Sequence, residues 1–161
     1  MIKVTTFYKF FFIPETRLEN IQSLLKKEGH HLNIRGLILI GTEGINATVS
    51  GLSDKLEQYK TIMQTLFPQE ELFYKDSLSE TWNFKRLSVK IKPEIVSVGK
   101  PEILLHKQDT PQKNDTLSPE KWDREIENKS QVLDVRNNYE TALGKFQEAQ
   151  ELDLDQFNEF P

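Results

Sequence analysis

The sequence predicts an α+β protein that begins with a compact domain over residues 1–92. Two stretches carry apolar residues at three- and four-residue spacing, which is typical of helices with one buried face. Four shorter stretches are rich in β-branched and aromatic residues or alternate apolar with polar ones, which is typical of strands. Their order along the chain is β-α-β-β-α-β. This order predicts a ferredoxin-like fold, an antiparallel sheet with both helices on one face.

The first strand and the first helix follow from local composition. Residues 3–9 are rich in β-branched and aromatic side chains and predict a strand. Pro14 suits the first turn of a helix, because the missing amide donor costs nothing there. We expect Gly29 to end this helix, since glycine adopts the left-handed C-terminal conformation without steric cost. The apolar stripe of the helix consists of Leu18, Ile21, Leu24 and Leu25.

A glycine-rich turn separates the second and third predicted strands. Residues 34–40 are apolar at nearly every position and predict a central strand, while residues 45–50 alternate between apolar and polar. Gly41-Thr42-Glu43-Gly44 between them has the composition of a hairpin loop. Neither glycine pattern of the phosphate-binding loops occurs, so we interpret the stretch as a turn, with ligand binding through its amides as the alternative. We expect a positive φ angle at Gly44 or Gly41.

The second helix and the fourth strand complete the predicted domain. Ser53 is placed to cap the helix by accepting a hydrogen bond from a free amide, and Pro68 ends it. After a polar connection, residues 87–91 alternate and predict the strand that completes the sheet. The apolar face of the helix consists of Leu56, Tyr59, Ile62, Met63, Leu66 and Phe67.

The remainder of the chain changes character. Residues 93–115 are polar with proline and Asx turn signals, and predict a linker. A second unit follows over residues 116–161, where Ser118 and Pro119 predict the start of a short helix. The run "SQVLDVRNNYE" then predicts a short strand that continues into a loop. Within the helix, Trp122 and Ile126 lie on one face.

Composition excludes several classes of site. The chain has no cysteine, which excludes disulfides, thiolate metal sites and cysteine nucleophiles within these 161 residues. Three histidines, two of them adjacent, do not favour a histidine metal site, so we expect no metal. No apolar run approaches the ~20 residues of a membrane span, and the first residues lack the layout of a secretory signal. We therefore expect a cytoplasmic protein with no membrane association.

Five ordered motifs together resemble one family. "EGINATVSG", "VKIKPEIVSVG", "LSPEKW", "VLDVRNNYE" and "GKF" are similar to the rhodanese-like tRNA uridine hydroxylases, the TrhO or YceA family. The resemblance covers essentially the whole chain and implies an acylphosphatase-like domain followed by a rhodanese-like domain, of which residues 116–161 are the incomplete first portion. It also implies oxygen-dependent conversion of the wobble uridine of certain tRNAs to 5-hydroxyuridine. Molecular oxygen is then the co-substrate, tRNA is the partner, and no metal or organic cofactor is identifiable.

The resemblance carries residue roles only in the second unit. Asp134, Arg136, Glu140 and Gly144 match the family stretch D-x-R-x-x-Y-E-x-x-x-G. Asp134 and Arg136 are expected either to organise a loop or also to shape the loop of the reactive cysteine. That cysteine is expected after Pro161, so no catalytic residue lies in this chain and we expect further residues beyond it. Two alternatives stay open: sulfur transfer by the rhodanese-like unit, and a non-catalytic RNA- or protein-binding module.

The charge distribution indicates which unit contacts tRNA. Residues 1–100 hold 14 basic and 11 acidic side chains, net +3, whereas residues 101–161 hold 7 and 14, net −7. Phosphates are neutralised by lysine and arginine, so Lys85, Arg86 and Lys90 are the candidate tRNA-binding residues, with a solvated surface as the alternative. Aromatic residues of the segment 8–12 are expected to pack at the edge of the core, with base stacking as the alternative.

Overall fold

The computed structural model describes residues 1–96 and 117–160, which fall into two compact units. The first unit contains the described residues 1–96, and the second contains residues 117–160. Most of the predicted linker, from residue 97 to residue 115, lies outside the described residues. The described part holds no helix long and apolar enough to cross a membrane.

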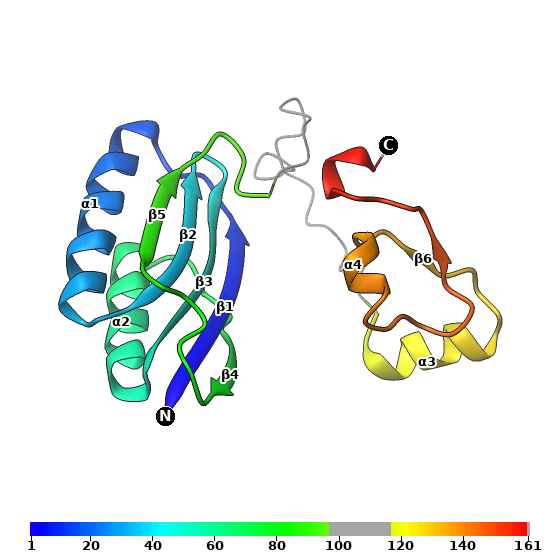
Figure 1. Cartoon of the computed structure of the whole chain (residues 1–161). Coiled ribbons are helices and arrows are strands. Elements are labelled where there is room, and N and C mark those ends of the chain that lie inside the picture. The colour runs from blue at the N-terminus through cyan, green and yellow to red at the C-terminus, as the bar shows by residue number, and fades with distance from the viewer. Residues whose placement is uncertain (97–116, 161) are drawn as a thin grey trace. The chain divides into compact units, whose positions relative to one another are not determined.

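The first unit is a five-stranded sheet with two helices on one face (Figure 1). The strand order is β4-β1-β3-β2-β5. The first four pair antiparallel, whereas β5 pairs in parallel with β2. The elements are β1 (Ile2–Phe10), α1 (Glu15–His31), β2 (Arg35–Gly41), β3 (Gly44–Leu52), α2 (Ser53–Leu66), β4 (Lys75–Ser79) and β5 (Leu87–Ile91).

The α+β, ferredoxin-like prediction is confirmed, but the strand that completes the fold is a different one. The fourth strand of the β-α-β-β-α-β order is β4, which pairs antiparallel with β1 at one edge. Residues 87–91, predicted for that role, form an additional fifth strand at the opposite edge. The residues of β4 read "KDSLS", and four of the five are exposed. A strand with this composition has no apolar alternation, so periodicity does not detect it.

Three details at the helix ends also differ from expectation. Helix α1 continues past Gly29 to His31, so Gly29 lies within the helix and does not form its left-handed cap. It is buried, and an added Cβ would overlap the Leu87 side chain of β5. Pro14 occupies the cap position just before the helix. Ser53 is the first residue of α2, Leu52 holds the cap position, and no side chain accepts a capping bond.

The core lies between the sheet and the two helices. Leu25 and Tyr59 are both fully buried, and the Tyr59 hydroxyl donates to the Leu25 carbonyl oxygen over 2.8 Å, which joins the two helices. Burial raises the pKa of the Tyr59 hydroxyl, so it stays a neutral donor. Leu24, which the sequence stripe included, is 38% exposed. The apolar face of α1 therefore consists of Leu18, Ile21 and Leu25, with Gly29.

The glycine-rich stretch is a tight hairpin. Gly41 pairs with Gly44, so only Thr42 and Glu43 form the turn. Gly44 has a φ of 140°, which confirms the expected positive angle, and an added Cβ would overlap the Lys9 carbonyl oxygen of β1. Both backbone conformation and close strand contact therefore require glycine at this position.

The second unit is small and contains short elements. Ser118 holds the cap position of its first helix and accepts from the Lys121 amide over 3.4 Å, with Pro119 next, as predicted. The loop expected after the strand contains a further short helix. The two strands pair in parallel. The elements are α3 (Pro119–Glu127), β6 (Leu133–Asp134), α4 (Asn138–Thr141), β7 (Gln150–Glu151) and the 3-10 helix η2 (Phe157–Glu159).

Candidate functional site

Asp134 and Arg136 form a two-point ion pair at the end of β6. The guanidinium donates from Nε to Asp134 Oδ1 over 2.9 Å and from Nη2 to Oδ2 over 2.7 Å. The Arg136 amide also donates to Oδ1 over 3.2 Å, so the carboxylate closes a local turn. Asp134 is buried and only 8% exposed, whereas the Arg136 side chain is 44% exposed. One carboxylate thus holds both the backbone and the side chain of Arg136.

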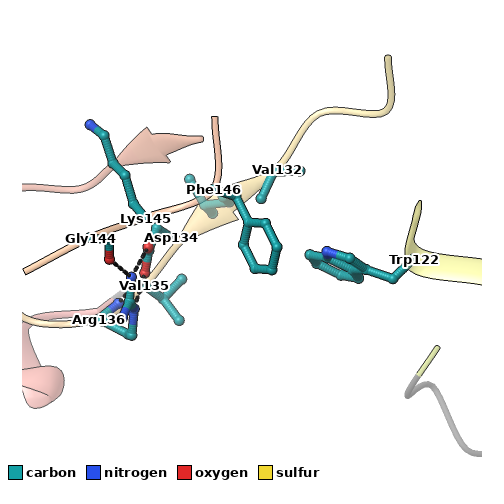
Figure 2. A pocket seen from close by; sticks show the side chains of 9 residues that line it. Trp122, Val132, Asp134, Val135, Arg136, Gly144, Lys145 and Phe146 are labelled. Carbon is teal, nitrogen blue, oxygen red and sulfur yellow. Dashed lines mark hydrogen bonds and ion pairs between the residues drawn. The ribbon is translucent and has the colours of Figure 1, made fainter. Parts of the chain in front are cut away.

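Arg136 links this turn to Gly144. Its Nη2 also donates to the Gly144 carbonyl oxygen over 2.8 Å, so three of the four resemblance residues lie together (Figure 2). Gly144 has a φ of 149°, a conformation that favours glycine, and nothing lies near its missing side chain. The fourth residue, Glu140, has a separate contact. Its carboxylate accepts from the Asn137 amide over 3.3 Å at the start of α4.

A depression of about 690 Å³ lies beside this ion pair. Figure 2 shows the Trp122 indole facing the Phe146 ring, and their centroids are 5.3 Å apart. The Trp122 Nε1 atom is buried and has no acceptor among the described residues. The depression is lined by Trp122, Val132, Leu133, Asp134, Val135, Arg136, Gly144, Lys145 and Phe146.

Two ion pairs determine the charges at and beside the depression. The hydrogen bond from Arg136 holds the pKa of Asp134 below its ordinary value, and that bond also raises the pKa of Arg136. Lys145 pairs with Glu151 of β7 over 2.8 Å and holds the pKa of that carboxyl low. Asp134, Arg136 and Glu151 are therefore charged at neutral pH.

The residues that line the depression combine charged and apolar side chains. None of the lining residues is a cysteine, serine, threonine or histidine, and Arg136 and Lys145 supply positive charge beside an apolar wall. Within residues 1–96 and 117–160, no three histidine, aspartate or glutamate side chains are grouped as metal ligands are. Sequence reasoning identified Asp134, Arg136 and Gly144 but not the contact between Trp122 and Phe146. The motifs "LSPEKW" and "GKF" contain both residues and were the available signal.

The candidate tRNA-binding residues lie on the first unit. Lys85 and Arg86 immediately precede β5, Lys90 lies within it, and all three are exposed. The Arg86 carbonyl oxygen accepts from the Gly36 amide over 3.0 Å, which fixes the start of β5 against β2. The three side chains are exposed to solvent in and just before this edge strand, and their role in binding tRNA stays a prediction.

The motifs "EGINATVSG" and "VKIKPEIVSVG" are in contact where the first unit ends. Glu43, buried in the hairpin turn, accepts from the Ile95 amide over 2.6 Å. Asn46 of β3 donates from Nδ2 to the Ile95 carbonyl oxygen over 2.9 Å. Both backbone groups of Ile95 are therefore held by the stretch "EGIN", and its side chain is fully buried. The first unit extends past the predicted boundary at residue 92 to include Ile95.

These features define a class of protein: a ferredoxin-like domain with an added parallel edge strand, followed by a small unit organised by an aspartate–arginine pair. The family model described as the UPF0176 acylphosphatase-like domain matches residues 2–95, more than half of the chain. The chain therefore belongs to this family.

Individual relatives match nearly the whole chain. A protein of Synechocystis sp. named tRNA uridine(34) hydroxylase is 37% identical over 163 residues, which cover 99% of this chain and 55% of that protein. A protein of Bdellovibrio bacteriovorus with the same name is 33% identical and matches 98% of this chain and 44% of its own length. This chain thus spans about half the length of these relatives.

A solved structure shows the same fold. The BLUF protein BlrB, in its dark state, has a TM-score of 0.50 and 14% sequence identity to this chain. The match covers 68% of this chain and 86% of BlrB. At this identity the likeness concerns the fold alone.

Proposed function

We propose that the protein to which this chain belongs hydroxylates the wobble uridine of tRNA to 5-hydroxyuridine, with molecular oxygen as co-substrate. One observation carries the proposal: relatives named tRNA uridine(34) hydroxylase match 98–99% of this chain at 33–37% identity. A match of this extent includes both units and the stretch from Asp134 to Gly144. The site of action is then the cytoplasm, where mature tRNA is used in translation.

The reactive cysteine is expected in the part of the relatives that this chain does not match, after residue 161. The depression around Arg136 is a suitable support for a loop that carries a thiolate, because a guanidinium nearby favours the charged form of the thiol. Exposed apolar side chains of the second unit give the same indication. Leu143 is 89% exposed, Phe146 is 51% exposed and Leu133 is 47% exposed, a surface that we expect further chain to cover.

The test is complementation with the complete protein. It is expressed in a bacterium whose own uridine hydroxylase gene is deleted, and tRNA nucleosides are measured by mass spectrometry. We expect 5-hydroxyuridine to return with the wild-type protein and not with a variant whose predicted cysteine is replaced by serine. Thiosulfate-dependent sulfur transfer without hydroxyuridine would favour a sulfurtransferase instead. Neither activity would favour a non-catalytic binding module.

The basic residues in and just before β5 are tested in the same system. Replacing Lys85, Arg86 and Lys90 together by alanine removes three positive charges, which lowers tRNA affinity and flattens its salt dependence. The matched control replaces Lys26, Lys27 and Lys55, which lie on the helices, by alanine. Unchanged tRNA binding and unchanged hydroxyuridine in the β5 variant would mean that these side chains only solvate the edge of the sheet.

A further inference from the structure

The face of the sheet opposite the helices carries no helix and presents side chains in rows, although Asn46 bonds to Ile95 and Arg35 stacks on Trp82 there. Helices α1 and α2 cover only one face (Figure 1). On the other face, the strand register places Tyr8, Asn46, Leu39 and Lys90 in one row across four strands. The next row contains Lys75, Thr6, Thr48, Leu37 and Ser88.

An exposed aromatic residue lies on this face. Tyr8 is 64% exposed, and its ring lies 6.1 Å from that of Phe10, edge to face. The neighbouring Phe11 is different, because it packs against Phe67 of the core at 5.1 Å. The expectation that this aromatic segment packs on the core therefore holds for Phe11 but not for Tyr8. An exposed aromatic ring on a sheet provides a stacking surface for an unpaired base.

The charged strand residues on the same face are basic. Among the described strand residues that the register places there, the ionisable side chains on β2, β4 and β5 are Arg35, Lys75 and Lys90, and none is acidic. Lys75 and Lys90 are exposed, whereas Arg35 stacks over the Trp82 ring at 3.9 Å. Lys90 lies three strands from Tyr8, about 14 Å at about 4.8 Å per strand. A strand of nucleic acid that stacks on Tyr8 brings phosphates within reach of Lys90.

We propose that the exposed part of this sheet face, around Tyr8 and Lys90, binds an unpaired stretch of RNA. The proposal rests on the proposed function, and it names the part of the protein that holds the single-stranded loop of the tRNA. RNA fits better than an acidic protein segment, because base stacking uses the exposed ring while the lysines neutralise phosphate. An acidic segment would use only the lysines. Double-stranded RNA offers no free base face to Tyr8, so the surface selects unpaired nucleotides.

The experiment measures RNA binding by the complete protein. The probes are an RNA stem–loop with an unpaired, uridine-containing loop and a fully paired RNA duplex of the same length. We expect Tyr8→Ala to weaken binding of the stem–loop by roughly 5- to 150-fold, the loss of one stacked base, and to leave the duplex unchanged. Tyr8→Phe keeps the ring and should retain wild-type affinity. Tyr139→Ala, which removes an exposed tyrosine of the second unit, is the matched control.

The charge is tested separately. Lys90→Gln should reduce the slope of log affinity against log salt by about 0.7, the value for one lost phosphate contact with a single strand. Lys27→Gln, on the helix side of the unit and 80% exposed, should leave the slope unchanged. An unchanged melting temperature in each variant confirms that the fold is intact.

Several outcomes would overturn the proposal. One is equal stem–loop affinity of the wild-type protein and Tyr8→Ala. Another is faster proteolysis between the two units in Tyr8→Ala without a change in RNA binding, which would assign the face to an intramolecular contact. Failure of the proposed function looks different. The wild-type protein would then form no 5-hydroxyuridine, while Tyr8→Ala would still lose affinity for the stem–loop.

Discussion

Lys60 of α2, which is buried, forms an ion pair with Asp76 of β4, and its Nζ lies 2.8 and 2.7 Å from the two carboxylate oxygens. Lys60 is 8% exposed and also contacts Glu57 over 3.2 Å. Lys3 of β1 approaches the same carboxylate over 3.4 Å. The Asp76 carboxylate thus joins an otherwise polar edge strand to the helix and to the neighbouring strand.

Replacing Asp76 by asparagine should therefore release β4. The variant leaves the nearly buried Lys60 ammonium without its main partner, at an expected cost of about 1–3 kcal/mol. We expect a lower melting temperature and faster amide exchange in residues 75–79. Glu80→Gln removes a nearby exposed carboxylate and serves as the control. Equal stability of the two variants would contradict a structural role for the pair.

The same carboxylate makes stability depend on pH. Burial, the largest single effect, raises the pKa of Asp76, but the interactions with Lys60, Lys3 and a further hydrogen-bond donor together outweigh it, and the pKa lies below its ordinary value of 3.8. The stabilisation is therefore complete above pH 3.8 and is lost as the pH falls below it through the folded-state pKa. Acid titration of the wild-type protein, followed by circular dichroism, should show this loss. Asp76→Asn should titrate with a weaker dependence in the same range.

Gly44 is expected to tolerate alanine poorly. The added Cβ would overlap the Lys9 carbonyl oxygen, and the alanine backbone would have to adopt a φ of 140°. We expect a loss of at least about 1 kcal/mol in the free energy of unfolding. Gly144→Ala has a similar φ of 149° in open space, so it measures the conformational cost alone. Denaturant titration should find Gly44→Ala the more damaging change, and the reverse order would be incompatible with strand contact as the main cause.

Glu43 is expected to hold the end of the first unit. Glu43→Ala leaves the buried Ile95 amide without an acceptor, which costs about 1–3 kcal/mol. Glu43→Gln retains an acceptor oxygen and should cost less. Hydrogen exchange at the Ile95 amide is the direct measurement: fast exchange in Glu43→Ala, and intermediate exchange in Glu43→Gln. Protection of Ile95 in both variants would show that another contact holds this segment.

Asp134 is expected to order the loop that contains Arg136 and Gly144. Asp134→Asn removes the charge that both guanidinium contacts use, so the Arg136 amide should exchange faster. The pKa of Asp134 lies below 3.8, so the wild-type loop should be protected above pH 3.8 and lose protection as the pH falls further. Asp123→Asn on the exposed face of α3 is the control. Equal exchange in both variants would mean that the ion pair does not order the loop.

Local features that depend on a few neighbouring residues were predictable. The apolar spacing of Leu18, Ile21 and Leu25 defined α1, and strict alternation defined β3, because a residue's face depends only on the period of its own element. The positive φ of Gly44 and the cap at Ser118 follow from the chemistry of single residues. The ordered motifs indicated the family, because matching residues needs no knowledge of spatial contacts.

Tertiary structure alone decided which strands form the edges of the sheet and what holds them there. The sequence by itself determined the β-α-β-β-α-β class, but it assigned the closing strand to residues 87–91 instead of 75–79. The reason is physical. Strand β4 is stabilised by the ion pair of Asp76 with Lys60, 16 residues away, and not by an apolar face of its own. The hold of Glu43 on Ile95, 52 residues away, and the exposure of Tyr8 likewise depend on contacts between distant segments, which no local period encodes.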